Sequence, residues 1–316
     1  MFSVVIPVYN KAPYLAKAIK SVKDQTFTDW ELILVDDGST DSSLQVIKDS
    51  IVGFDSQIKF FLQPNQGVSV ARNNGVAASQ YEYVAFLDAD DWWEPGFLEE
   101  MAFLINNYSN AAWFASDYYY IKHGSKRIAD KGIPVGFKSG YLDFIKIYSR
   151  MFCVLVNCSF VVIKKDIFFQ LGGFKKKLKF GEDIHLWLQL ACSFPLAFSA
   201  KPLSNSFQDV DASRAIGWKI YSPESSFLFD FDDILRKNPD NKELKFLIDG
   251  LRVRGLWKYR LSGKYKIAYQ QELAKVDWAS QPIEYKKYYT WPLVFWKLYW
   301  FLRKLGSEAK TWFYKK

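Results

Sequence analysis

Cysteine and histidine are scarce in this sequence of 316 residues, which contains 3 Cys and 2 His. The cysteines, Cys153, Cys158 and Cys192, are too few and odd in number for a disulfide framework, and none lies in a CxxC pair. We therefore expect buried thiols in a reducing compartment. Two histidines without a nucleophile elbow argue against a serine-type hydrolase, and the absence of a GxxxxGKS/T stretch argues against a P-loop.

Long uncharged runs are also missing. Residues 151–163 form one uncharged run in the first domain, and it is much shorter than the roughly 20 residues that a membrane-spanning helix needs. Residues 1–7 (MFSVVIP) carry no basic region or cleavage site, so they predict an immediate strand and no signal peptide. Neither paired zinc cysteines nor a basic zipper occurs, so nucleic acid is not an expected partner.

Positive charge and aromatic rings are in excess. The sequence has 42 Lys and Arg against 34 Asp and Glu, a net charge of +8, and 18% of its residues are aromatic. A basic balance favours anionic partners such as phosphorylated substrates or acidic lipid headgroups, and aromatic rings suit stacking on bases and sugars. Composition alone does not choose among these partners.

Residues 1 to about 110 alternate between strand-like and helix-like stretches, which predicts a parallel sheet with covering helices. Short apolar runs indicate buried strands, and apolar residues spaced along one face indicate helices. The expected strands are residues 3–8, 31–35, 58–62 and 83–87, and the expected helices are residues 14–25, 41–49 and 68–78.

The pattern becomes mixed between about residues 111 and 205. Short strands are expected at residues 112–115 and 159–163, and a helix at residues 181–192. Apolar and polar residues do not alternate regularly elsewhere in this stretch, so longer loops are expected there.

A change of composition near residue 220 suggests a boundary. Residues 224–280 have a helical, charged pattern, and residues 285–316 are rich in aromatic residues and lysine. We expect a catalytic domain over residues 1–220 and a helical, aromatic and basic C-terminal region over residues 221–316.

Acidic residues follow directly after two of the expected strands, at residues 36–37 (DD) and 88–91 (DADD). In open α/β sheets, ligands bind beyond the carboxyl ends of the strands. A single Asp-Gly turn would be ordinary, because Asp is common in turns and helix caps. Two acidic clusters after two strands of one sheet instead indicate a binding site.

Seven short motifs carry most of the information about function. They are residues 4–10 (VVIPVYN), 25–27 with 30–41 (QTF and WELILVDDGSTD), 65–67 (NQG), 71–73 (ARN), 86–91 (FLDADD), 172–174 (GGF) and 181–187 (GEDIHLW). In this order they resemble the family 2 glycosyltransferases, over residues 1–215. The resemblance implies an α/β GT-A fold: a Rossmann-like nucleotide-diphospho-sugar transferase with a mixed sheet and flanking helices.

That resemblance implies displacement at the anomeric carbon of a sugar, with a nucleoside diphosphate as the leaving group. Negative charge develops on this group, and a divalent cation held by carboxylate oxygens stabilises it. By the same resemblance, residues 88–90 (DAD) are the DxD motif. Asp90 is then the expected ligand of Mn²⁺ or Mg²⁺, and Asp88 is the expected contact to the ribose or sugar. Alternate residues of an extended segment face the same side, so both carboxylates can face one site.

Nucleotide binding is assigned by the same resemblance to the first strands. Pro7 and Tyr9 are expected to lie against the base, and Asp37 to accept a hydrogen bond from it. A carboxylate suits the N–H of uracil, so UDP is the expected nucleotide. Arg72 is expected near the base or the diphosphate, although a surface salt bridge is an alternative interpretation of this residue.

The resemblance makes Asp183 the catalytic base of an inverting reaction. Asp183 opens an apolar helix, so desolvation would raise its pKa while the helix N-terminus would lower it. Glu182 is expected to orient the acceptor or a neighbouring loop. No histidine follows His185 to complete a metal shell, and His185 itself is expected on the helix surface or the acceptor side. Arg214 is a further candidate contact to the diphosphate.

Residues 285–316 combine Trp and Tyr with Lys and Arg, and Lys297 interrupts the apolar stretch. This composition is typical of a helix at a membrane interface; packing on the catalytic domain or on a second subunit is the alternative.

The basic tract at residues 175–179 (KKKLK) is expected on the acceptor side. A lipid-linked or lipopolysaccharide-type glycan at the cytoplasmic face of the membrane is the expected acceptor.

The sequence thus predicts an inverting, metal-dependent glycosyltransferase that moves a hexose or N-acetylhexosamine from a UDP-sugar to a glycan hydroxyl in cell-surface glycan synthesis. A sugar-phosphate nucleotidyltransferase is an alternative, but it would carry a glycine-rich N-terminal loop where this sequence has PVYN at residues 7–10. A non-catalytic sugar-nucleotide-binding module is a second alternative. The acidic residues Asp37, Asp88, Asp90 and Asp183 argue against it.

Overall fold

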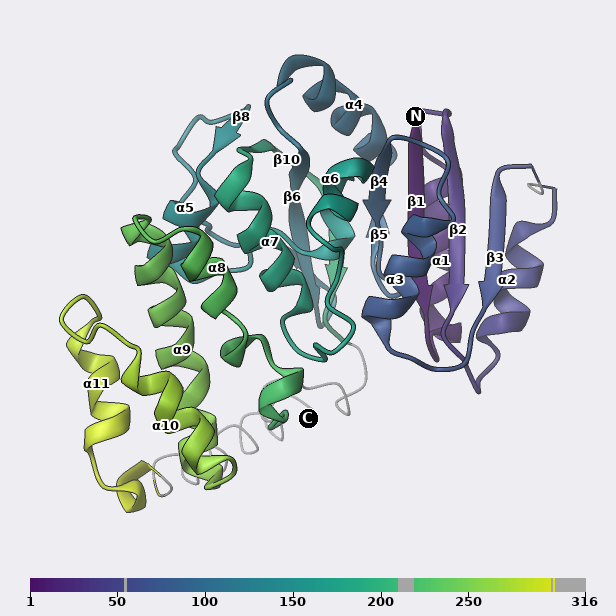
Figure 1. Cartoon of the computed structure of the whole chain (residues 1–316). Helices are drawn as coiled ribbons and strands as arrows, with labels where there is room; N and C mark the ends of the chain where they lie inside the picture. Colours follow the sequence, from purple (N-terminus) through teal and green to yellow (C-terminus); the bar gives the residue numbers. More distant parts are fainter. Residues whose placement is uncertain (54–55, 210–218, 297, 299–316) are drawn as a thin grey trace. The chain divides into compact units, whose positions relative to one another are not determined.

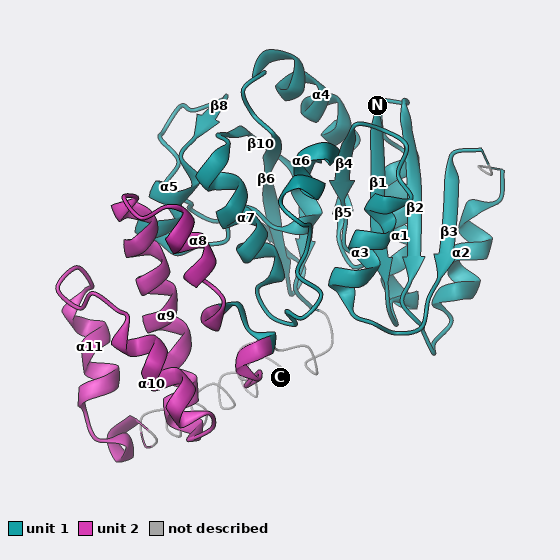
Figure 2. Cartoon of the chain, in the orientation of Figure 1, with its two compact units in different colours: residues 1–215, 225–227 teal, residues 216–224, 228–316 magenta. Residues whose placement is uncertain are grey.

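The computed structural model describes residues 1–53, 56–209, 219–296 and 298. These residues belong to two compact units (Figure 2). One unit comprises Met1–Ala215 with Ser225–Phe227, and the other Ile216–Glu224 with Leu228–Lys316. Arg214, Lys297 and residues 299–316 lie outside the described residues, so the expectations for them stay predictions.

In unit 1 the strands form one mixed sheet with helices on both faces (Figure 1). The strands are β1 (Phe2–Val8), β2 (Trp30–Asp36), β3 (Ile58–Leu62), β4 (Tyr83–Phe86), β5 (Trp92–Trp93), β6 (Trp113–Lys122), β7 (Ser125–Arg127), β8 (Ser139–Leu142), β9 (Val161–Lys164) and β10 (Leu196–Phe207). The helices are α1 (Ala12–Lys23), α2 (Ser43–Ile51), α3 (Val68–Ala77), α4 (Phe97–Asn107), α5 (Phe144–Met151), α6 (Lys165–Gln170) and α7 (Glu182–Ser193), with a short 3₁₀ turn η1 (Cys158–Phe160) before β9.

The sheet has the strand order β3–β2–β1–β4–β9–β6–β10–β5, with β7 beside β6 and β8 beside β10. The first four strands in this order pair in parallel, which confirms the parallel sheet predicted from residues 1–110. β9 runs antiparallel to both of its neighbours, whereas β6 and β10 are parallel to each other. The predicted α/β class with a mixed sheet and flanking helices is therefore confirmed.

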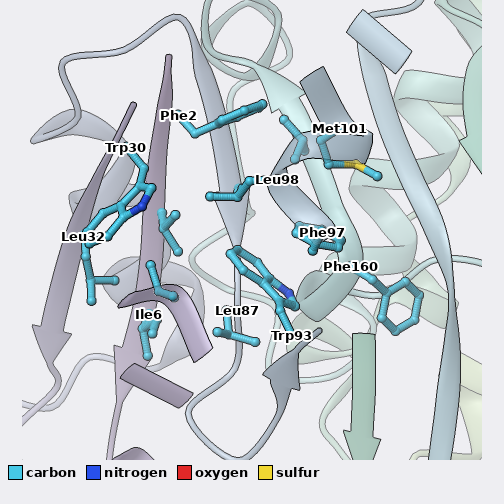
Figure 3. Packing of buried hydrophobic residues seen from close by; sticks show 14 of the residues in the cluster. Phe2, Ile6, Trp30, Leu32, Leu87, Trp93, Phe97, Leu98, Met101 and Phe160 are labelled. Atoms are coloured by element: carbon cyan, nitrogen blue, oxygen red, sulfur yellow. The ribbon is translucent and has the colours of Figure 1, made fainter. Parts of the chain in front are cut away.

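Alternate side chains of β1 pack on opposite faces of the sheet. Ile6 belongs to a cluster that includes residues of α1 and α4, and the stacked rings of Trp93 and Phe97 lie 4.2 Å apart in the same cluster (Figure 3). On the other face, α3 approaches so closely that a Cβ on Gly75 would be only 2.4 Å from Cγ1 of Val5. This core holds the carboxyl ends of β1, β2 and β4 together at one edge.

Several elements after residue 110 differ from expectation. The strand expected at residues 112–115 runs on to Lys122, and the one expected at residues 159–163 begins as the turn η1. The turn arises because the side-chain carbonyl of Asn157 accepts a hydrogen bond from Ser159 N–H at 2.8 Å. β10 was not expected, because its register shifts around Pro202 and its apolar pattern is interrupted there.

Unit 2 is helical in its described part, as predicted for residues 224–280. Its helices are α8 (Asp232–Lys237), α9 (Lys242–Ser262), α10 (Lys266–Ala274) and α11 (Ile283–Thr290). Two 3₁₀ turns, Pro223–Ser225 and Phe227–Phe229, precede them, and each turn has residues in both units. α9 begins where the Asn241 side chain accepts a hydrogen bond from Leu244 N–H at 2.9 Å. Within the described residues, no helix combines the length and the apolar character needed to cross a bilayer.

Candidate active site

Hydrogen bonds of Asn10 connect the segment that follows β1 to the segment that follows β2. Its φ of 51° is left-handed, a conformation that Asn adopts more readily than most residues. The Asn10 side-chain carbonyl accepts a hydrogen bond from Thr40 N–H at 2.8 Å, and its own N–H donates to Ser39 Oγ at 3.0 Å. Of the two residues expected against a base, Pro7 is buried within β1, and Tyr9 just beyond the strand is 43% exposed.

Asp37 lies at the carboxyl end of β2 and holds the loop that enters α3. Its carboxylate accepts hydrogen bonds from Gln63 Nε2 at 2.7 Å and from the N–H groups of Gln66 and Gly67 at 2.8 Å each. A carboxylate offers about four acceptor positions, and three are used here. Asp37 is thus fixed in place, with capacity for about one further donor.

Residues 88–91 follow β4, and hydrogen bonds of Asp91 and Ser159 fix their loop in place. Asp91 is buried, and its carboxylate accepts hydrogen bonds from Ser159 Oγ and from Phe207 N–H at 2.8 Å. Ser159 Oγ in turn accepts from Asp88 N–H at 3.1 Å. Burial raises the pKa of Asp91 well above its usual range, with the neighbouring Asp88 and Asp90 adding to the effect. Asp91 therefore supports the loop from the interior, and Asp88 and Asp90 are less deeply buried than Asp91.

Arg72 brings Asp88 and Glu182 together from different parts of the sequence. This residue of α3 is 4% exposed. Its Nη2 donates to Asp88 Oδ1 at 2.7 Å, and its Nη1 donates to Glu182 Oε1 at 3.1 Å. The guanidinium also lies 5.2 Å from the centre of the Phe174 ring. The alternative interpretation as a surface salt bridge is wrong, because the Arg72 side chain is buried in both ion pairs.

The start of α7 places Glu182 and Asp183 beside this cluster. The helix begins after Gly181, whose φ of 73° is left-handed. A Cβ at Gly181 would lie 2.2 Å from Cδ1 of Phe227, so the close packing also requires glycine. The GED motif therefore has a local structural cause: the glycine permits the turn that directs the two carboxyl groups into the first turn of the helix.

Asp183 has a strongly shifted pKa. Burial, reinforced by Glu182, raises the pKa of Asp183 to about 7, although the Ile184 N–H at 2.7 Å and Arg72 act in the opposite direction. Desolvation thus outweighs the stabilisation of a carboxylate at a helix N-terminus. A carboxyl group that titrates near neutral pH can accept a proton and also release it at physiological pH.

Asp90 pairs with a residue that the sequence analysis missed. The Nζ of Lys11, at the N-terminus of α1, forms an ion pair with Asp90 Oδ2. Both DxD carboxylates therefore lie against a basic side chain, Asp88 against Arg72 and Asp90 against Lys11. Lys11 and Asp90 are 79 positions apart, so no local pattern could have joined them.

A divalent cation would find hard oxygen donors at Asp88 and Asp90. Mg²⁺ commonly takes one or two carboxylates together with substrate phosphates and water, and Mn²⁺ accepts similar ligands. In the part of the chain that the structure describes, no group of three or more His, Cys, Asp or Glu residues is placed to hold an ion. This donor set fits a cation that shares its shell with a bound diphosphate.

His185 lies in the interior and not on a helix surface. It is 1% exposed, and its N–H donates to Gly181 O at 3.0 Å. The helix-surface position expected for it is wrong, because every residue of α7 from His185 to Leu188 is buried. The expected acceptor-side position stays a prediction. Ser159, like Lys11, contributes to the site without having been expected there.

The sequence profile of the glycosyl transferase family 2 matches residues 3–163, about half of the chain. An uncharacterized glycosyltransferase of Rickettsia conorii is 31% identical over 203 residues, which are 64% of this chain and 32% of that protein. The chain thus corresponds to about a third of the length of that relative. The putative teichuronic acid biosynthesis glycosyltransferase TuaG of Bacillus subtilis is 31% identical over 192 residues, 60% of this chain and 71% of that protein.

Among solved structures, residues 1–349 of S. aureus TarS in complex with UDP-GlcNAc match with a TM-score of 0.64 and 19% identity. The match covers 86% of this chain and 78% of that one. At this identity the likeness concerns the fold, and it agrees with the GT-A architecture predicted from the motifs. The profile match and the similarity to TuaG show that the chain belongs to the glycosyl transferase family 2.

Proposed function

We propose that this chain is an inverting, metal-dependent glycosyltransferase that transfers a hexose or N-acetylhexosamine from a UDP-sugar to a hydroxyl group of a glycan. Family membership supports the reaction class. The observation that carries the proposal is Asp183, a carboxyl group whose pKa burial raises to about 7 and which lies close enough to Arg72 and Asp88 for their charges to act on it. Such a group is suited to act as a base next to a site for an anionic leaving group.

In the proposed reaction, the acceptor oxygen attacks the anomeric carbon while the bond from that carbon to the diphosphate oxygen breaks. The acceptor proton passes to the carboxylate of Asp183, and the diphosphate leaves with the bonding electron pair. Attack from the side opposite the leaving group inverts the anomeric configuration. A positioned base of this kind typically contributes about 10²- to 10⁴-fold to the rate.

Asp90 is the proposed protein ligand of Mn²⁺ or Mg²⁺, and Asp88 the proposed contact to the ribose or sugar. The cation, when bound, would offset the negative charge that develops on the diphosphate. Arg72 orients Asp88 through the 2.7 Å hydrogen bond and adds a buried positive charge on the diphosphate side.

Pro7, Tyr9 and Asp37 are the proposed contacts to the base. The side chain of Tyr9 is 43% exposed, and Asp37 keeps capacity for about one more donor, such as the uracil N–H. That the TarS structure was solved with UDP-GlcNAc supports UDP as the nucleotide.

We place the acceptor on the side of Glu182 and of the basic tract at residues 175–179. In that tract the side chain of Leu178 is buried, while Lys176, Lys177 and Lys179 are exposed. Exposed ammonium groups suit an anionic or lipid-linked glycan. The assignment of TuaG to teichuronic acid biosynthesis supports a role in cell-surface polysaccharide synthesis.

The C-terminal region is proposed to contact the inner face of the cytoplasmic membrane without crossing it. Apolar and basic side chains are exposed together in its described part, as is typical of segments at headgroup depth. The exposed residues are Ile283, Lys286, Lys287, Trp291, Leu293, Val294, Phe295 and Leu298.

A panel of UDP-, GDP- and dTDP-sugars, each with Mn²⁺, tests the proposed activity. We expect only UDP-sugars to raise the melting temperature, since binding to the folded state stabilises it, and we expect release of UDP when an acceptor glycan is added. Asp183→Asn should keep the thermal shift and lose turnover. If no nucleotide sugar raises the melting temperature, or if Asp183→Asn turns over as fast as the wild type, the proposal is wrong.

Co-sedimentation with vesicles that contain anionic lipid tests the membrane contact. The double substitution Trp291→Ala with Phe295→Ala should reduce binding, because both side chains are exposed, at 49% and 57%. Val135→Ala is the matched control, since it removes an exposed apolar side chain from unit 1. Equal binding of the double variant and the control would argue against the membrane contact, without bearing on the reaction.

A further inference from the structure

Lys11 connects the first turn of α1 to the DxD motif. Its backbone N–H donates to Ser43 Oγ at 2.8 Å, and its carbonyl accepts from the N–H groups of Tyr14 and Leu15 at 2.9 and 3.0 Å. The residue is 8% exposed, and its Nζ pairs with Asp90 Oδ2. The ammonium group is therefore held at Asp90 by a fixed backbone and a buried stem.

This ion pair is largely shielded from water. The side chains of Lys11 and Asp90 are 10% and 14% exposed, whereas those of Lys20 and Asp24, a pair in the same part of the chain, are 73% and 49% exposed. Water and salt screen a buried pair much less than an exposed one. A divalent cation at Asp90 would have to share its ligand with an ammonium group, and the two positive groups would repel each other.

We infer that Lys11 is an internal counter-ion that competes with the divalent cation for Asp90, so that cation binding depends on the nucleoside diphosphate. In the ligand-free chain, Lys11 neutralises the carboxylate, and an incoming cation must displace it. The diphosphate brings negative charge that offsets both positive groups, so the cation and the nucleotide bind well only together. This inference rests on the proposed role of Asp90 as the metal ligand.

Coupling of this kind is reciprocal. UDP must raise the affinity for the cation by the same factor by which the cation raises the affinity for UDP. A neutral side chain at position 11 removes the competitor, so the free chain should bind the cation more tightly. The factor by which UDP improves cation binding should become smaller.

Calorimetric titration of the full chain with Mn²⁺, without UDP and with saturating UDP, tests the inference. Without UDP, we expect Lys11→Met and Lys11→Gln to bind Mn²⁺ about tenfold more tightly than the wild type, within the usual range of coupling between sites. Lys11→Arg keeps the charge and should behave as the wild type. Lys20→Met, which removes an exposed charge from the same helix, is the matched control. Circular dichroism melting curves show whether each variant is folded.

Asp90→Asn separates failure of the inference from failure of the proposed function. If Asp90→Asn weakens Mn²⁺ binding while Lys11→Met and Lys11→Gln bind as the wild type or more weakly, the competition is disproved and the metal role of Asp90 stands. If Asp90→Asn binds Mn²⁺ as tightly as the wild type, the cation lies elsewhere. Both the metal role of Asp90 and the role of Lys11 are then wrong.

Discussion

Two opposite influences meet at the carboxyl group of Asp183. It lies in the first turn of α7, where backbone N–H groups favour the ionised form. Burial and Glu182 favour the neutral form and raise its pKa to about 7. The sequence shows both influences, because the residue opens an apolar helix. Their balance depends on how deeply the first turn is buried.

The pH dependence of the rate should follow this carboxyl group. If Asp183 is the base, kcat falls about tenfold per pH unit below the pKa near 7, because only the ionised form accepts the proton. Asp183→Asn should lower kcat by about 10²- to 10⁴-fold and remove this acidic limb. Rates measured from pH 5 to 9 check both points. If kcat of Asp183→Asn still falls at low pH as in the wild type, a group other than Asp183 causes that fall.

Stability should depend on pH in the opposite sense to activity. The pKa of Asp183 is higher in the folded chain than its ordinary value of 3.8, so the unfolded chain binds fewer protons between these two values. The contribution of this group to stability is therefore present below pH 4 and is lost as the pH rises through about 7. Asp183→Asn should raise the melting temperature at pH 8 relative to the wild type, and much less at pH 5. A lower melting temperature at pH 8 would contradict this.

At the scale of elements, the start of α7 depends on the contact between Gly181 and Phe227. Gly181→Ala should be destabilising for two reasons: the left-handed φ of 73° and the 2.2 Å approach of the new Cβ to the ring. Left-handed backbone costs a non-glycine residue about 1–2 kcal/mol, and overpacking adds about 1–3 kcal/mol. Urea denaturation measures the total loss in the free energy of unfolding from these two contributions.

Gly124→Ala is the matched control for the backbone contribution. Gly124 has a φ of 71° in the same unit, and a Cβ there would have nothing within 4 Å. Gly124→Ala should therefore be destabilised only by the cost of the left-handed backbone and not by overpacking. Equal losses of stability in the two variants would show that Phe227 moves aside without cost.

At the scale of the whole molecule, unit 2 has a charged interior of its own. Arg252 of α9 is fully buried and pairs with Glu272 of α10 at 2.8 Å and with Asp232 of α8 at 3.1 Å. Removing one partner of a buried ion pair leaves an uncompensated charge and typically costs about 3–5 kcal/mol. This network links three consecutive helices of unit 2.

Arg252→Leu should destabilise unit 2 by about 3–5 kcal/mol, as measured by urea denaturation with amide hydrogen exchange to locate the change. Arg236→Leu is the control, because its pair with Asp233 is exposed, at 77% and 65%. We expect a loss of about 0.5 kcal/mol or less there. If Arg252→Leu is no less stable than this control, apolar packing and not the charge network stabilises the three helices.

The agreement between sequence and structure is uneven across the chain. The parallel strands β1–β4 were predicted within one residue at each end, because each is a short apolar run bounded by polar residues. β10 was missed, since its pairing with β6 shifts register around Pro202. The division into a catalytic domain and a C-terminal region, and the roles of the site residues, remain predictions.

The sequence by itself determined the family, the parallel strands and which acidic residues follow them, because these depend on local patterns and on the order of short motifs. Only the tertiary structure decided which charges face each other: Arg72 between Asp88 and Glu182, and Lys11 against Asp90. The physical reason is that ion pairing and desolvation depend on distance and burial in space, and neither can be read from positions that lie 79 or 110 residues apart along the chain.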